Sequence, residues 1–224
     1  MEAKLETKQD TPKGNTACAY REDRIEPVTK TAKPGYLCLK RGLDIAVSLV
    51  ALLLLFIPML LISLAVWLET PGPAIFKQQR MGRNGKPFAI YKFRTMKNTA
   101  PSDLAAMDLP NPDQHVTKLG SILRHSSIDE LPQLINVLKG DMSLVGYRPV
   151  CLTETALNDL RMRCGVFMLR PGITGLAQVK GRDKLHYTQK VELDAQYVSQ
   201  CSLKLDIWCL LQTVRIVITG EGVN

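Results

Sequence analysis

Two adjacent carboxylates, Asp129 and Glu130, are the side chains best suited to do chemistry in this 224-residue chain. They lie in residues 127–132 (SIDELP), directly before apolar residues whose spacing predicts a helix. Two helix starts fit the spacing: Ser127 as N-cap with Glu130 completing a capping box, or Asp129 as N-cap with Pro132 in the first turn. In both cases the carboxylates lie at a helix N-terminus, whose dipole favours ionised groups and whose free amides bind phosphate.

Capping alone would explain these carboxylates, but several cations occur in the segments around them. Carboxylates together with clustered cations suit a divalent metal ion and a diphosphate. The chain contains no P-loop, no G-x-G-x-x-G and no G-x-S-x-G segment, so NTPase, dinucleotide and serine hydrolase chemistry have no support. The three histidines are isolated in the sequence and predict no metal site. The cations in question are Lys92, Arg94, Arg124, Arg148 and Arg170.

The net charge of +8 is concentrated in the middle of the chain. Residues 71–182 hold 16 basic and 8 acidic side chains, whereas the regions on either side are balanced. This surplus predicts an anionic partner without distinguishing nucleic acid, anionic lipid and phosphorylated substrate. With 46% hydrophobic and 22% charged residues, a wholly disordered or fibrous protein is excluded. The six cysteines form no C-x-x-C pair, which argues against a zinc site or a disulfide framework.

An uncharged run of 24 residues from Ile45 to Leu68 predicts membrane insertion. As a helix it would be about 36 Å long, and roughly 20 apolar residues already cross the hydrocarbon core. Pro58 divides the run into pieces of 13 and 10 residues, each too short to cross alone, and removes one backbone donor. Basic residues flank the run on both sides, and such residues are retained on the cytoplasmic face. We therefore predict a re-entrant helix-break-helix, with a kinked single span as the alternative.

The remaining chain alternates between strand-like and helix-like patterns. Residues 1–35 are polar and proline-rich, which predicts a flexible tail. Two β-rich runs around Gly82-Arg83-Asn84-Gly85 predict a hairpin, and residues 97–117 predict a loop with at most a short helix. Polar side chains in the apolar C-terminal helix predict that it lies on a surface or interface rather than crossing a bilayer. Helices are expected over residues 131–138, ending at Gly140, and over 191–198 and 203–219.

Several segments in unbroken order resemble the bacterial sugar transferase family, the monotopic phosphoglycosyl transferases of the inner membrane. They cover residues 36–222. The resemblance implies transfer of a phospho-sugar from a UDP-sugar to a polyprenyl phosphate, usually undecaprenyl phosphate, with Mg²⁺ as cofactor and UMP released. The segments are KRGLDIAVS, the apolar run with its internal proline, PGPAIFKQQRMGRNGKPFAIYKFRTM, SSIDELPQLINVLKGDMSLVGYRP and RPGITGLAQVKGR.

The resemblance also implies individual roles. Asp129 would be the nucleophile on the sugar-bearing phosphate, giving a covalent phosphoaspartyl sugar, and Glu130 would assist with metal binding or proton handling. Both are therefore candidate Mg²⁺ ligands, and the five cations named above would contact substrate phosphates. Arg161 lies outside the matching segments, and we expect it to contribute little. Tyr147 and Leu176 depart from residues often found in the family, which affects donor preference rather than reaction class.

These observations predict an α/β monotopic membrane enzyme of the bacterial inner membrane. Residues 1–35 would form the tail, 36–69 the re-entrant membrane helix, and 70–224 a small cytoplasmic catalytic domain with interfacial amphipathic helices. The expected partners are a UDP-sugar, a polyprenyl phosphate and the membrane, without nucleic acid, and a homodimer is compatible with the sequence. The alternative from another class is a non-catalytic, membrane-tethered protein that binds nucleic acid or anionic lipid.

Overall fold

The computed structural model describes residues 25–28, 32–99, 112–181 and 185–219. Most of the predicted tail and the middle of the predicted loop lie outside these residues. The helices are α1 (Pro34–Glu69), α2 (Pro112–His115), α3 (Lys118–His125), α4 (Gln133–Lys139), α5 (Thr155–Arg163), α6 (Leu176–Lys180), α7 (Tyr187–Gln200) and α8 (Leu203–Thr219). The strands are β1 (Ile75–Met81), β2 (Pro87–Phe93), β3 (Ser143–Val145) and β4 (Gly172–Thr174), and three 3₁₀ turns are η2 (Arg83–Gly85), η4 (Ile128–Glu130) and η5 (Val166–Met168).

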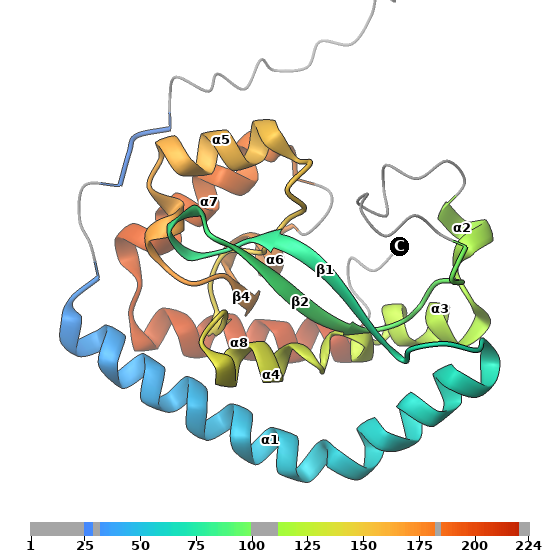
Figure 1. Ribbon diagram of the computed structural model, residues 1–224. Helices are drawn as coiled ribbons and strands as arrows, with labels where there is room; N and C mark the ends of the chain where they lie inside the picture. Colours follow the sequence, from blue (N-terminus) through green and yellow to red (C-terminus); the bar gives the residue numbers. More distant parts are fainter. Residues whose placement is uncertain (1–24, 29–31, 100–111, 182–184, 220–224) are drawn as a thin grey trace, which may run out of the picture.

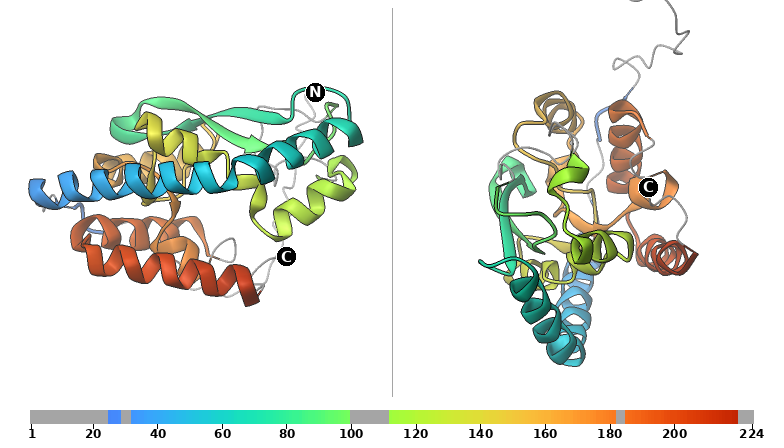
Figure 2. Two further views of the ribbon diagram at one scale, coloured as in Figure 1. Left: turned by 90° about the horizontal axis from the view of Figure 1, so that it is seen from below. Right: turned by 90° about the vertical axis from the view of Figure 1, so that its right-hand side faces the viewer.

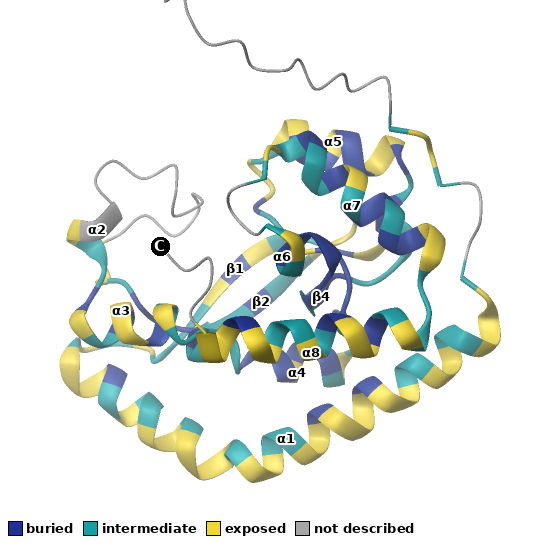
Figure 3. Cartoon of the chain, turned by 180° about the vertical axis from the view of Figure 1, so that it is seen from behind, coloured by how far each residue is buried: buried dark blue, intermediate teal, exposed yellow. Residues whose placement is uncertain are grey.

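Helix α1 underlies the rest of the molecule as one long, bent rod (Figure 1). It is helical throughout its 36 residues, so the predicted break at Pro58 is wrong and a bend takes its place. The reason is that a proline removes only one donor and displaces one carbonyl, which bends a long helix without ending it. By length and composition α1 is able to cross a membrane. Its outer face is exposed along most of its length, reaching 75% at Leu54 (Figure 3).

Both ends of α1 are attached to the same body, while its middle stands clear. Near the N-terminal end, the Asp44 carboxylate accepts hydrogen bonds from the Ser143 hydroxyl at 2.8 Å and the Leu144 amide at 3.1 Å. Near the other end, Val66 is buried in a cluster with Phe93 of β2. The bend is consequently the part of the helix that projects furthest from the domain (Figure 2).

The described residues form two small sheets that lie between the helices. Strands β1 and β2 form an antiparallel hairpin, which confirms the predicted turn, with Asn84 in the left-handed region (φ 57°) that a tight turn requires. Strands β3 and β4 pair in parallel and bring together chain segments on either side of α5. The mixed α/β class is thus confirmed, but each sheet contains two strands.

The helices pack around the sheets and supply much of the hydrophobic core. Helices α5 and α7 pack around a cluster that includes Tyr147, Phe167 and Val191. The predicted helix at 203–219 is confirmed as α8, and the one at 191–198 is the C-terminal part of the longer α7. One face of α8 remains apolar and exposed, reaching 78% at Ile218. A separate cluster of Ile90, Val137 and Met142 packs α4 against β2.

Candidate active site

Asp129 and Glu130, called the dyad below, lie in a turn that precedes helix α4 rather than in the helix itself. Ser127 adopts the left-handed conformation (φ 57°), and residues 128–130 then form the 3₁₀ turn η4. Helix α4 begins after Pro132, whose fixed φ suits a helix start and whose missing donor is not needed there. Because α4 begins at Gln133 with Pro132 as N-cap, and Ser127 forms no side-chain cap, the predicted helix starts at Ser127 and at Asp129 are both wrong. The predicted end is confirmed, because Gly140 takes the left-handed C-cap conformation (φ 92°).

Asp129 is the buried member of the dyad, with 8% of its surface exposed. Burial raises the pKa of its carboxyl group. The positive charge of Lys92 opposes this shift, the neighbouring Glu130 adds to it, and Arg148 and Arg124 oppose it further. Asp129 is thus a desolvated carboxylate that depends on surrounding cations to remain ionised.

Glu130 has the opposite electrostatic environment. Its Oε1 accepts a hydrogen bond from Lys92 Nζ at 2.7 Å and another from Arg148 Nη2 at 3.0 Å. Burial alone would raise the pKa of Glu130, but Arg148 and Lys92 together hold it well below its usual range. Two adjacent carboxyl groups whose pKa values are pushed apart are typical of acids and bases with distinct roles. Glu130 therefore orients the two cations, and Asp129 is the carboxylate with the weaker compensation.

Sequence reasoning did not assign Arg80 to this site. Strand alternation places Arg80 on the same face of the hairpin as Ile90 and Lys92, because Gln78 of β1 pairs with Ile90. Among the described residues, the buried Nε of Arg80 has no hydrogen-bond partner. The alternation of side chains along the two strands of the predicted hairpin could have placed Arg80 on the same face as Lys92. A small cavity of about 30 Å³ lies here, lined by Arg80, Ile90, Lys92, Glu130, Gln133, Arg148 and Pro149.

Three of the five predicted phosphate-binding cations lie around the dyad. Lys92 and Arg148 contact Glu130 as described, and Arg124 acts on Asp129 while its Nε donates to Thr95 Oγ1 at 2.8 Å. The resulting surplus of positive charge suits a diphosphate.

The structure places the other two predicted cations elsewhere. Arg94 is buried and donates to the Thr70 carbonyl, the Thr70 hydroxyl (3.0 Å) and Asn98 Oδ1 (2.8 Å), which fixes the C-terminal end of α1. Arg170 donates from Nε to the Gly140 carbonyl at 2.8 Å, at the end of α4 away from the dyad. Contact of these two arginines with substrate phosphates remains a prediction.

Arg161 contacts the site through the backbone of Arg148. Its side chain is 1% exposed and pairs with Asp194 at 2.6 Å. Its Nη1 donates to the backbone carbonyl of Arg148 at 2.8 Å, and its guanidinium lies 5.2 Å from the Tyr147 ring centroid. The expectation that Arg161 contributes little does not fit this geometry, because the residue holds the backbone that carries Arg148.

The acidic dyad fits a Mg²⁺ ion bound together with a substrate diphosphate. Magnesium is commonly held by one or two carboxylates, with waters and phosphate oxygens completing its coordination. Asp129 and the second oxygen of Glu130 could supply these ligands, since the described contacts of Glu130 engage only Oε1. When bound, the ion would reduce the negative charge of the diphosphate.

Comparison with known proteins identifies the family. The bacterial sugar transferase family profile matches residues 35–220. The chain belongs to the bacterial sugar transferase family. It is therefore a transferase enzyme, and the resemblance seen in its sequence is confirmed.

Similar proteins include an uncharacterized sugar transferase, EpsL of Bacillus subtilis, which is 42% identical over 83% of this chain and 90% of its own length. The UDP-glucose:undecaprenyl-phosphate glucose-1-phosphate transferase of Caulobacter vibrioides is 43% identical over 82% of this chain and 71% of its own length. The Escherichia coli enzyme of the same name is 42% identical over 79% of this chain. The match to this bacterial sugar transferase covers 39% of the length of the E. coli enzyme and less than half of the length of several other relatives. The chain therefore corresponds to one region of those proteins.

Proposed function

We propose that this bacterial sugar transferase moves a sugar-1-phosphate from a UDP-sugar to a polyprenyl phosphate, with Asp129 as the nucleophile. The observation that supports this most strongly is the asymmetric dyad, in which a buried carboxylate lies beside a partner already paired with two cations. The names of the C. vibrioides and E. coli relatives, which describe this transfer for glucose, agree with it.

The chemistry proceeds in two displacements at the sugar-bearing phosphorus. An oxygen of Asp129 forms a bond to this phosphorus while the bond to the bridging oxygen of the diphosphate breaks, and UMP leaves with that oxygen. A phosphate oxygen of the polyprenyl phosphate then attacks the same phosphorus and displaces the Asp129 carboxylate. The products are a polyprenyl diphosphate sugar and UMP, and the carboxylate is restored.

The cations of the site lower the repulsion between anions in both steps. Lys92 and Arg148 are fixed by Glu130, so their positive charges are already in place before the reaction. Arg80 has a buried Nε with no partner among the described residues, and we assign it to the diphosphate as well. Guanidinium groups suit this role because their donors match phosphate oxygens.

We further propose that α1 enters the membrane and returns to the cytoplasmic face. Because both ends of α1 are attached to one domain, a straight crossing would have to break the contacts at one end. The exposed apolar bend would lie in the hydrocarbon, and the exposed face of α8 would lie along the interface.

The transfer is tested by incubating purified protein with Mg²⁺, a polyprenyl phosphate and a panel of UDP-sugars, and measuring UMP. We expect UMP release with at least one UDP-sugar and its loss on chelation of the metal. Intact UDP-sugar throughout the panel, from protein that is folded and inserted, would contradict the proposal.

A further inference from the structure

Two arginines, Arg41 and Arg170, lie at the end of α4 away from the dyad, and a third, Arg83, lies near Arg170. Arg41 of α1 and Arg170 donate to carbonyls at this end over 2.6–3.0 Å. A helix C-terminus attracts cations, so the position of these two has a structural explanation. The position of Arg83 is not explained by a helix C-terminus. Arg83 is exposed on turn η2, and its Nε donates to the Met168 carbonyl at 3.1 Å.

The positive charge of this cluster is poorly compensated. Burial lowers the pKa of Arg170, as do the nearby charges of Arg83 and Arg41, and the charge of Asp44 opposes them. Both oxygens of Asp44 already accept hydrogen bonds from β3, one of them from the Ser143 hydroxyl. Among the residues that the structure describes, the terminal nitrogens of Arg83 make no hydrogen bond. The cluster therefore retains donors and positive charge for an anion.

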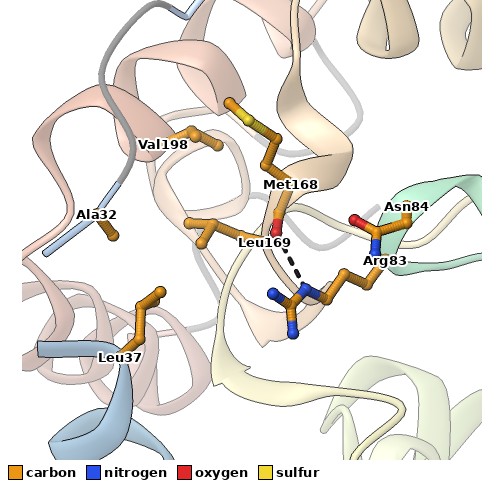
Figure 4. Close-up of a pocket in the computed structure, with 7 residues that line it drawn as sticks. All are labelled: Ala32, Leu37, Arg83, Asn84, Met168, Leu169 and Val198. Atoms are coloured by element: carbon orange, nitrogen blue, oxygen red, sulfur yellow. Dashed lines mark hydrogen bonds between the residues drawn. The ribbon is translucent and has the colours of Figure 1, made fainter. Parts of the chain in front are cut away.

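An apolar pocket of about 250 Å³ adjoins Arg83 and includes Leu169, the residue before Arg170 (Figure 4). The side chain of Arg83 extends from the hairpin turn toward Leu169 and Leu37, so a guanidinium lies at the edge of an otherwise largely apolar cavity. A ligand that fills both features must carry an anionic group next to an apolar one. The pocket is lined by Ala32, Leu37, Arg83, Asn84, Met168, Leu169 and Val198.

The position of the pocket along α1 indicates where such a ligand comes from. Leu37 lies in the first turn of α1, and exposed apolar side chains begin at Leu39 and continue past Leu43 toward the bend. If α1 inserts, the pocket and its arginines are at the level of the lipid headgroups. Anionic lipids attract basic side chains at this level.

We propose that Arg41, Arg83 and Arg170 bind the phosphodiester headgroup of an anionic bilayer phospholipid, with the adjoining part of the lipid in the apolar pocket. The donors of a guanidinium group match phosphate oxygens in pairs, and a zwitterionic headgroup would bring its own cation into this basic cluster. The site requires insertion of α1 but not the transfer chemistry, since it lies beyond the far end of α4, whose seven residues rise by about 10 Å.

Binding is measured on the full chain in non-ionic detergent, by native mass spectrometry during titration with dioleoyl phosphatidylglycerol or dioleoyl phosphatidylcholine. We expect phosphatidylglycerol to bind roughly 10-fold more tightly than phosphatidylcholine, and Arg83→Gln to weaken it by about the same factor. Arg83→Lys should be intermediate, because it keeps the charge and loses the paired donors. Lys86→Gln is the matched control, since Lys86 is exposed on the same hairpin turn. Thermal unfolding verifies that each variant is folded.

Four results would overturn the proposal. Equal affinity for the two lipids would show that the headgroup charge is not recognised. Equal weakening by Arg83→Gln and Lys86→Gln would show a general field rather than a site. Displacement of the lipid by inorganic phosphate at matching concentration would identify a free phosphate as the ligand. A raised KM for polyprenyl phosphate in Arg83→Gln, with phosphatidylglycerol binding unchanged, would assign the cluster to the acceptor. None of the binding measurements depends on UMP release.

Discussion

At the N-terminal end of α4, Lys92 and Arg148 pair with the carboxylate of Glu130, whereas at its C-terminal end Arg41 and Arg170 pair with backbone carbonyls. Both ends concentrate positive charge. At the first end a second carboxylate, the buried Asp129, lies beside Glu130, whereas the buried carboxylate near the second end, Asp44, accepts hydrogen bonds from β3. Cations fixed by one carboxylate next to a second, desolvated carboxylate suit covalent chemistry. Cations fixed by carbonyls next to an apolar pocket suit the binding of an anionic amphiphile. The two proposals therefore assign different functions to two basic clusters, according to the groups that fix their cations.

The largest expected effect is that of Asp129→Asn. The amide has nearly the same size and removes the anionic nucleophile, so turnover should fall by at least about 10³-fold while the protein folds and inserts. UMP release and thermal unfolding are the two measurements. The matched change Glu130→Gln should also impair turnover, but by loosening Lys92 and Arg148. A fully active Asp129→Asn would reduce the dyad to a structural turn.

Arg148→Ala comes next. A charge-assisted hydrogen bond contributes about 1.5–3 kcal/mol, so kcat/KM for the UDP-sugar should fall by roughly 10–150-fold. Arg80→Ala should act in the same direction if its Nε contacts the diphosphate. The control is Lys118→Ala, which removes the same charge from an exposed position. Equal losses in Arg148→Ala and Lys118→Ala would mean that net charge, rather than a site, determines activity.

Arg161→Lys tests whether the buried pair behind the site positions Arg148. Lysine keeps a positive charge for Asp194 but cannot also donate to the Arg148 carbonyl with the same geometry. We expect KM for the UDP-sugar to rise about 10-fold, roughly one charge-assisted hydrogen bond, with kcat less affected. Arg163→Lys, two residues along and exposed, is the control. A purely structural role would instead lower the unfolding temperature and leave the KM of the folded enzyme unchanged.

The smallest and most graded effect is expected for Pro58→Leu. Leucine restores the missing backbone donor, so α1 should straighten and a fraction of the molecules should cross the membrane. In a background without native cysteines, single cysteines at positions 32 and 84 report the two flanks through an impermeant thiol reagent in intact cells. Both should resist labelling while Pro58 is present, and position 32 should become labelled in a fraction of the Pro58→Leu molecules. External labelling of position 32 with Pro58 in place would contradict the re-entrant arrangement.

Local features of the fold could be predicted from the sequence. Helix α8, the hairpin turn at Asn84 and the helix stop at Gly140 follow from periodicity and backbone preference, which act over a few residues. The dyad was found through its spacing and the family resemblance. The continuity of α1 through Pro58 was not predicted, because a proline inside an apolar run is equally compatible with a bent helix and with a broken one.

The positions of the cations could not be predicted, because they depend on tertiary contacts. Arg170 and Arg148 look equivalent as members of basic motifs, yet one meets the Gly140 carbonyl and the other meets Glu130. Arg161 resembles a surface residue in a basic segment, but the fold buries it and pairs it with Asp194 between α5 and α7. Sequence reasoning therefore predicted three cations that the structure places around Asp129 and Glu130, and two arginines that the structure places elsewhere.

The covalent intermediate tests the central claim most directly. The purified enzyme is mixed with a UDP-sugar and Mg²⁺ in the absence of lipid acceptor, quenched, digested and analysed by mass spectrometry. The account predicts about one equivalent of UMP and a sugar phosphate attached to Asp129, which disappears when polyprenyl phosphate is added before quenching. UMP formation only in the presence of the acceptor, with Asp129 unmodified throughout, would contradict it and require direct attack of the acceptor phosphate on the UDP-sugar.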